Sequence, residues 1–450
     1  MRVAVVGGGI AGLAATWELK GSAEVAVFDP GPLGGCLRTE PFDGRPVDCG
    51  PDAFIARAPE GLALCAEAGV DDLVTPVAGR SLVWWGGKAR PLPDGLVLGA
   101  PRRLGPLARS GLLSPAGLVR AAADLVLPRN VPSAGDLSVR SLVASRFGAE
   151  VADRLVDPLV GGIHAGRSAD LSAEATVPQL LAAARSSRSL LLGLRSLTPP
   201  GGPSGAVFAA PRGGMAALVA ALVESLQRQG VRFEQAAVRS VERDGSRWRV
   251  EPDDGPFDAV VLALPSSGAA GLLGDSAPAY LRRIRRVSVV IATLGYRRLD
   301  VPEGVNGVLF PPDPAVLITA CSFGSSKWPH WAEPGRTVLR LSAGRDGDGR
   351  AFSLGDEQLV ERLASDASKV VPGAEQPDGW RVNRWPESFP QYEVGHLQAV
   401  AAAEDDIARH LPGVVLCGSS YHGAGIPACI ASGRGAARRL VAAASERTAG

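Results

Sequence analysis

The spacing of apolar residues changes several times along the chain, and each change predicts a different kind of element. Residues 3–29 contain an apolar strand, a glycine-rich turn, a helix and a second apolar strand that ends at Asp29. Residues 58–70 have helical spacing up to Gly69, and residues 80–98 form short strand-like runs typical of a hairpin. The N-terminal part of the chain therefore predicts a mixed α/β fold.

The middle of the chain is predominantly helical. Between residues 101 and 197, Leu, Ala and Arg recur at three- and four-residue intervals, with prolines at several boundaries. This pattern predicts an inserted helical lobe. Two leucine-rich stretches, residues 111–127 and 189–197, are expected to be buried, with a membrane surface as the alternative.

Strands and helices alternate again after this block. Residues 258–265 (DAVVLALP) predict a buried strand, and several strand-like runs follow in residues 288–341. Residues 413–440 read as a strand, a glycine turn and a helix. A helix beyond residue 211 presents one leucine face, made of Leu218, Leu222 and Leu226. We therefore expect the chain to return twice to its first domain.

The glycine turn near the N-terminus carries the clearest chemical signal. Gly7 allows a tight turn, Gly9 lets the backbone approach a pyrophosphate, and Gly12 lets the helix pack closely on the strand. Asp29 stands where a carboxylate can accept hydrogen bonds from a ribose. This context predicts dinucleotide binding. A second glycine pair, Gly34–Gly35, favours a larger cofactor, with a plain surface turn as the alternative.

Composition and charge restrict the class of protein. The 450 residues are 46% hydrophobic, which predicts two or three domains. The 47 basic and 46 acidic residues create no overall field for nucleic acid or an anionic membrane. Six cysteines without CxxC spacing suit a reducing cytoplasm. No run reaches the about 18 apolar residues of a membrane helix, so we expect a soluble or peripheral protein without an integral membrane segment.

Several longer motifs resemble the flavin amine oxidase superfamily, and within it the FAD-dependent coproporphyrinogen III and protoporphyrinogen oxidase family. The resemblance covers nearly the whole chain, and the motifs of its second half are the most specific. The motifs are GPLGGCLRTEPFDG, CGPDAFIARAPEGLALCAEAGV, PLVGGIHAGRSADLSAEATVPQL, PRGGM, DAVVLALP, FGSSKWPH, RWPESFPQYEVGH and GSSYHGAGIPACIASGR.

The resemblance implies a fold with three parts. These are a discontinuous Rossmann-type FAD-binding domain, a mixed-sheet substrate domain and an inserted helical lobe. The implied ranges are 1–75, 205–265 and 405–450 for the FAD-binding domain, 76–100 and 266–404 for the substrate domain, and 101–204 for the lobe.

The resemblance also implies how FAD is held. Val238 would meet the adenine through its backbone, and Trp385 would pack near the flavin ring, with a core tryptophan as the alternative for Trp385. The full set of implied cofactor-binding residues is Gly7, Gly9, Ala11, Gly12, Asp29, Gly34, Gly35, Arg38, Gly50, Val238, Trp385, Gly418, Ile426 and Pro427.

On the substrate side, the resemblance implies that Gly162 and Ile163 flank one side of a porphyrinogen macrocycle and Leu309 the other. Basic residues near the expected mouth could meet its carboxylates, although most surface Lys and Arg are merely solvated. These candidates are Arg57, Lys88, Arg90 and Arg167.

No side chain is expected to act as a catalytic residue or to bind a metal. The histidines are scattered, and none has metal-ligand spacing or belongs to a nucleophile–base pattern. This suits a flavin enzyme, in which the cofactor carries the chemistry. The five histidines are His164, His330, His396, His410 and His422.

The chain departs from the family pattern at a few positions near the expected site. His164 and Arg167 replace an aromatic and an acidic or amide residue beside the AG pair. In the closing motif, His422, Ala424 and Ala428 are also unusual. A histidine could tune proton transfer there, or could simply be a hydrogen-bonded structural residue.

The implied reaction removes three electron pairs stepwise from a porphyrinogen, with oxygen regenerating the flavin and forming hydrogen peroxide. By the resemblance, Val97 stands where animal and plant protoporphyrinogen oxidases place a propionate-binding arginine. Without that arginine, protoporphyrinogen IX, which has only two propionates, would be poorly anchored. We therefore predict coproporphyrinogen III as substrate. The alternatives are protoporphyrinogen IX, an amine, or flavin binding without catalysis; a total of 5% aromatic residues supplies an amine cage poorly.

Overall fold

The computed structural model of the protein describes residues 1–128, 130–197 and 206–449. It divides into two units, each with its own core. Unit 1 comprises Met1–Thr75, Ala206–Ile284 and Leu397–Gly450, and unit 2 comprises Pro76–Gly205 and Arg285–His396. The finer division into three domains stays a prediction.

Unit 1 is organised around a parallel five-stranded sheet in the order β12-β2-β1-β16-β22. The central strands are apolar throughout, apart from Arg2 and Glu24 at the start of the first two, because both faces of a parallel sheet are covered. Numbered by their order in the chain, these strands lie as third, second, first, fourth and fifth. Their bounds are β1 (Arg2–Val6), β2 (Glu24–Phe28), β12 (Arg232–Glu234), β16 (Ala259–Leu262) and β22 (Val414–Leu416).

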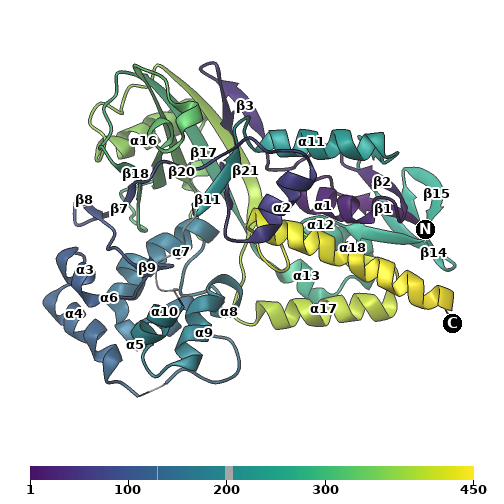
Figure 1. Ribbon diagram of the computed structural model, residues 1–450, viewed down its shortest axis with the longest axis horizontal. Coiled ribbons are helices and arrows are strands. Elements are labelled where there is room, and N and C mark those ends of the chain that lie inside the picture. Colours follow the sequence, from purple (N-terminus) through teal and green to yellow (C-terminus); the bar gives the residue numbers. More distant parts are fainter. Residues whose placement is uncertain (129, 198–205, 450) are drawn as a thin grey trace. The chain divides into compact units, whose positions relative to one another are not determined.

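The helices of unit 1 pack on this sheet and on one another (Figure 1). α1 is buried at nine of its ten residues and lies against α18. In α11 the leucine face predicted from the sequence is buried. The helices are α1 (Ile10–Leu19), α2 (Pro59–Glu67), α11 (Met215–Arg228), α12 (Ser266–Leu273), α13 (Ala279–Arg283), α17 (His396–His410) and α18 (Ile426–Ala449), with a 3-10 turn at Gly274–Ser276.

Three small antiparallel sheets complete unit 1. They pair β3 with β4, β11 with β5 and β6, and β14 with β13 and β15. Their bounds are β3 (Thr39–Phe42), β4 (Arg45–Asp48), β5 (Phe54–Ile55), β6 (Leu73–Val74), β11 (Phe208–Pro211), β13 (Ser240–Asp244), β14 (Arg247–Glu251) and β15 (Asp253–Phe257).

Unit 2 contains a seven-stranded sheet in the order β21-β17-β20-β19-β18-β7-β8. It is antiparallel except where β18 and β7 run in parallel. The hairpin predicted for residues 80–98 is confirmed, because β7 and β8 pair across a turn at Gly86 and Gly87. The strands are β7 (Arg80–Trp85), β8 (Lys88–Pro91), β17 (Arg286–Arg297), β18 (Val305–Leu309), β19 (Ile318–Phe323), β20 (Arg336–Ala343) and β21 (Gly379–Pro390), with a separate pair β9 (Leu96–Val97) and β10 (Ala100–Pro101).

The helical block predicted between residues 101 and 197 is confirmed within unit 2. Leu190, Leu191 and Leu194 face its core, as expected for a buried leucine-rich helix. Serine side chains cap α4, α5, α8 and α10. Its helices are α3 (Leu104–Arg109), α4 (Pro115–Ala122), α5 (Val139–Phe147), α6 (Ala149–Val151), α7 (Asp157–His164), α8 (Ala173–Thr176), α9 (Pro178–Ser186) and α10 (Leu190–Ser196), with a 3-10 turn at Ala123–Leu125 and a π turn at Ala152–Val156.

Other short helices of unit 2 lie beside its sheet. They are α14 (Gly324–Lys327), α15 (Arg350–Ser353) and α16 (Asp356–Ser368), with a 3-10 turn at Pro329–Trp331. Among the described residues of the whole chain, no helix has the length and apolar character needed to cross a bilayer.

Candidate functional site

The glycine turn between β1 and α1 tolerates no side chain at two positions. Gly7 has a φ of +104°, and a Cβ there would lie 2.4 Å from the carbonyl oxygen of Ala263. A Cβ at Gly12 would lie 1.9 Å from the carbonyl oxygen of Gly7. Any larger residue would therefore push the turn away from the strand or the helix away from the turn.

The N-terminus of α1 is open where an anion would bind. Gly9 caps the helix without a side-chain hydrogen bond, and no acidic residue lies in the first turn. A Cβ at Gly9 would meet no atom within 4 Å. The turn follows the carboxyl end of β1, where the strand order changes direction between β1 and β16. Ligands of open α/β sheets bind at such points, with phosphates at the helix N-terminus.

The second glycine loop lies beside the first. The amide of Gly34 donates to the carbonyl oxygen of Gly8 at 2.8 Å, and Gly9 and Gly34 form a parallel bridge. A Cβ at Gly35 would lie 3.5 Å from the Cα of Gly9. Because both loops lack side chains at their contact, one extended ligand could run along the two backbones.

Asp29 is held by the backbone of both loops. Its Oδ2 accepts from the amide of Gly8 at 2.7 Å, and its Oδ1 accepts from the amide of Gly31 at 2.8 Å. Each carboxylate oxygen has a second lone pair, so the half-buried group can still accept from a ribose hydroxyl. These contacts also fix the shape of the glycine turn.

Other predicted cofactor residues gather in the same unit. The amide of Cys49 donates to the carbonyl of Arg38 at 2.8 Å, which brings Gly50 near Arg38, and Arg38 pairs with Glu40. A Cβ at Gly418 would lie 3.9 Å from the Cβ of Ala11. Two further predicted residues, Ile426 and Pro427, are buried at the start of α18.

Val238 and Trp385 have different surroundings. Within the described parts of the chain, the backbone N–H and C=O of Val238 make no hydrogen bond, which leaves both able to meet an adenine edge. Trp385 belongs to unit 2, where it packs on the small apolar cluster of Ala165, Val287 and Val289. In unit 1, the two glycine loops, Asp29 and the backbone of Val238 together form a site that fits a dinucleotide.

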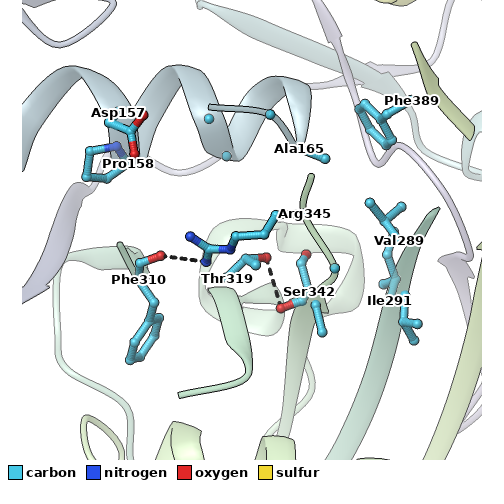
Figure 2. A pocket seen from close by; sticks show the side chains of 16 residues that line it. Asp157, Pro158, Ala165, Val289, Ile291, Phe310, Thr319, Ser342, Arg345 and Phe389 are labelled. Atoms are coloured by element: carbon cyan, nitrogen blue, oxygen red, sulfur yellow. Dashed lines mark hydrogen bonds between the residues drawn. The ribbon is translucent and has the colours of Figure 1, made fainter. Parts of the chain in front are cut away.

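Unit 2 contains a pocket of about 90 Å³ between α7 and the end of β20 (Figure 2). Its walls combine glycines, apolar side chains and a few polar groups. They are Asp157, Pro158, Gly161, Gly162, Ala165, Gly166, Val289, Val290, Ile291, Phe310, Thr319, Ser342, Ala343, Gly344, Arg345 and Phe389.

The predicted macrocycle contacts are close to this pocket. Gly162 lines it, and a Cβ at Gly162 would lie 3.8 Å from the Cδ2 of Leu309. Ile163 is the next residue and is 49% exposed. Because Gly162 and Leu309 are nearly in contact, a flat ring placed between them would require the Leu309 side chain to move.

The predicted basic residues are spread over the surface, and none of them lines the pocket. Arg57 is exposed in unit 1, and Lys88 is exposed on β8. Arg90 is half-buried and donates from Nε to the carbonyl of Trp85 at 3.4 Å. Arg167 is exposed, and its Nε lies 3.8 Å from Asp170 Oδ2.

The pocket contains polar residues that the sequence did not single out. Arg345 enters the pocket from the loop after β20 (Figure 2). The other polar residues are Asp157 from α7, Thr319 from β19 and Ser342 from β20. These residues belong to no recognisable motif. The only local signal is a glycine followed by an arginine, Gly344–Arg345, directly after the strand β20.

The two unusual histidines have different environments. Burial lowers the pKa of His164 to about 4, so its imidazole is neutral at pH 7. Its carbonyl oxygen accepts from Gln391 Nε2 at 3.0 Å. The Nε2 of His422 lies 3.1 Å from both carboxylate oxygens of Glu404. In the described residues, no cluster of three His, Cys, Asp or Glu side chains could hold a metal.

Comparison with known proteins agrees with this arrangement. Residues 10–441 match the family model described as flavin containing amine oxidoreductase. The chain is 33% identical to the coproporphyrinogen III oxidase of Bacillus subtilis (strain 168), covering 97% of each chain. It is 36% identical to the coproporphyrinogen III oxidase of Mycobacterium bovis, covering 98% of this chain and 97% of that one.

A similar architecture occurs among crystal structures. That of a candidate protoporphyrinogen oxidase from Exiguobacterium sp. 255-15 superposes with a TM-score of 0.89 at 28% identity, covering 98% of both chains. Both proteins thus share a mixed α/β fold with parallel and antiparallel sheets. The family match spans nearly the whole chain and names its cofactor as a flavin, in agreement with FAD. This protein belongs to the flavin-containing amine oxidoreductase family.

Proposed function

We propose that this protein is an FAD-dependent oxidase that converts coproporphyrinogen III to coproporphyrin III in haem biosynthesis. The observation that carries the proposal is the nearly full-length similarity to bacterial coproporphyrinogen III oxidases. The cytoplasm is the proposed location, because all six cysteines, which lie within the described residues, are thiols.

The three segments of unit 1 would form a discontinuous Rossmann-type domain around FAD. The pyrophosphate would lie at the N-terminus of α1 beside Gly9 and Gly34, because Gly9 caps this helix without a side-chain hydrogen bond. Asp29 would accept from the adenosine ribose, and the backbone of Val238 would meet the adenine. Arg38 and Gly50 would lie along the ribityl chain.

When bound, FAD supplies an acceptor for electron pairs and a route for them to oxygen. Removal of three electron pairs and six protons from the porphyrinogen would reduce three oxygen molecules to three hydrogen peroxides. The protein's own task is to bind and orient the substrate and to exclude water. Gly162 and Leu309 present small and apolar surfaces suited to a tetrapyrrole.

Coproporphyrinogen III is favoured over protoporphyrinogen IX by the uncharged residue at position 97. Val97 is half-buried on β9 and offers no cation for a propionate. Protoporphyrinogen IX, which has only two propionates, would therefore be poorly anchored. The similarity to the Exiguobacterium protein favours protoporphyrinogen IX as the second candidate.

An anaerobic substrate panel tests the proposal. The flavin absorbance of the purified holoprotein should bleach with coproporphyrinogen III faster than with protoporphyrinogen IX at equal concentration. A simple primary amine should leave the flavin oxidised. Faster bleaching with protoporphyrinogen IX would make that compound the preferred substrate. No bleaching with either porphyrinogen would overturn the oxidase function.

A further inference from the structure

The pocket of unit 2 has the size of a substrate arm. Its volume of about 90 Å³ is well below the roughly 300–1,000 Å³ of pockets that enclose a whole drug-sized ligand. Apolar side chains of Val289 and Phe389 form part of its wall. A short methylene chain with a polar end would match both the volume and the mixture of surfaces.

The backbone around Arg345 is fixed before any ligand binds. Gly344 has a φ of +96°, and a Cβ there would lie 2.5 Å from the carbonyl oxygen of Ser288. The amide of Asp348 donates to the carbonyl of Arg345 at 2.9 Å. The amide of Asp346 donates to the carbonyl of Ala165, at the end of α7, at 2.7 Å. The arginine is therefore anchored on both sides of the pocket.

The guanidinium of Arg345 points into the pocket with most of its donors unused (Figure 2). Its Nη2 donates to the carbonyl oxygen of Phe310 at 3.1 Å. Across the described part of the chain, no carboxylate lies within 4 Å of this guanidinium. Asp157, the carboxylate whose charge acts most strongly on Arg345, is engaged through Oδ1 with the amide and hydroxyl of Ser168, at 2.8 and 2.6 Å.

Burying the charge of an arginine that has no carboxylate partner destabilises the folded protein. Burial lowers the pKa of Arg345, which reports the loss of water around its charge. The loss is compensated when an anion binds, and a planar guanidinium suits a carboxylate because two parallel hydrogen bonds form. Thr319 and Ser342 line the same pocket, and because the Thr319 hydroxyl already donates to the Ser342 carbonyl at 3.0 Å, only the Ser342 hydroxyl adds a neutral donor.

We infer that this pocket binds one propionate carboxylate of the porphyrinogen and that Arg345 is the specificity-determining residue that holds it. The inference rests on the proposed function, because that function supplies a substrate with four propionates.

Binding of the oxidised product tests the inference without turnover. Fluorescence titration of the holoprotein should give an about 10–100-fold higher Kd for coproporphyrin III in Arg345→Gln than in wild type, as expected for a lost charge-assisted hydrogen bond. Coproporphyrin III tetramethyl ester, measured in the same cosolvent, should bind both proteins alike. Arg345→Lys should lose less affinity for the acid, because it keeps the charge without the planar fork.

The matched control is Arg297→Gln, which removes an arginine that is 73% exposed in the same unit. It should bind both porphyrins as wild type does. An equal loss for acid and ester in Arg345→Gln, or no loss, would overturn the inference.

If Arg345→Gln does not fold, as judged by flavin content and thermal unfolding, Arg345→Lys decides by the same acid-against-ester comparison. The proposed function fails separately, when wild-type flavin stays oxidised with coproporphyrinogen III under anaerobic conditions. That result would also remove the basis for the propionate assignment.

Discussion

At the scale of single residues, Asp29 joins the two glycine loops of unit 1. We expect Asp29→Ala to weaken FAD binding by roughly 1.5–3 kcal/mol, the usual contribution of a hydrogen bond to a charged group. Two effects combine, because the variant loses an acceptor for the ribose and releases the amides of Gly8 and Gly31. Fluorescence titration of the deflavinated protein with FAD measures the change.

Asp29→Asn provides the control for shape. Its amide oxygen can still accept from one backbone amide, so it should lose less affinity than Asp29→Ala. Unchanged FAD affinity in Asp29→Ala would show that the glycine fingerprint has been misassigned.

His164 predicts an acid-sensitive contribution to stability. Burial lowers its pKa from 6.5 to about 4, so between these values the unfolded chain binds a proton that the folded chain does not. Stability from this group is therefore complete above pH 6.5 and is lost as the pH falls toward 4. The loss should be on the order of 2–3 kcal/mol.

Urea unfolding from pH 7 to pH 4 measures this contribution. The free energy of unfolding of His164→Gln should fall less than that of wild type between pH 7 and pH 4, because glutamine does not titrate. His410→Gln, at a position whose side chain is 66% exposed, is the matched control and should follow wild type. An equal loss of unfolding free energy on acidification in wild type and His164→Gln would rule out this role for His164.

At the scale of elements, the contact between α1 and α18 depends on one glycine. A Cβ at Gly433 would lie 2.1 Å from the carbonyl oxygen of Ala11. Gly433→Ala should therefore lower the free energy of unfolding by about 1–3 kcal/mol through overpacking. Denaturant unfolding monitored by circular dichroism measures the change.

Gly435→Ala on the same helix is the control. The nearest atom to its Cβ would be the Nη1 of Arg439, at 3.7 Å, at the end of a flexible side chain. This variant should be neutral or gain up to about 1 kcal/mol from the higher helix propensity of alanine. Equal effects of the two substitutions would mean that the helices are not packed as closely as the structure indicates.

At the scale of the whole molecule, we expect a yellow protein whose FAD is not covalently attached. Cys417 precedes the closing glycine, and burial raises the pKa of its thiol to about 12, so it is protonated and a poor nucleophile at pH 7. Acid precipitation of the purified protein should release all the flavin into the supernatant. Colour that stays in the pellet would contradict this prediction.

Local sequence patterns were sufficient to predict much of the fold. The strand, turn and helix that include Gly7 and Gly12 follow from apolar runs and from steric limits that act between near neighbours. The buried face of α11 follows from its helical periodicity, and the buried strand β16 follows from its continuous apolar run. These features are predictable because each depends on residues that are close in the chain.

The return of the chain to its first sheet was also predictable, since β16 and β22 have the uniform apolar character of parallel strands. The cofactor-binding residues carried over from the resemblance stay predictions, although most lie together in unit 1. The substrate-side basic residues were chosen because they were expected near the mouth of the site, and none of them lines the pocket.

The sequence by itself thus determined the repeated strands, the glycine loops and the family, because these are encoded in local spacing and in motifs. Only the tertiary structure placed Arg345 opposite α7 and left its guanidinium without a carboxylate partner within 4 Å among the described residues. The pocket is formed by α7, β17, β19 and the loop after β20, which are far apart in the chain. No local pattern records which side chains such distant segments bring together, because that depends on how each unit packs its core.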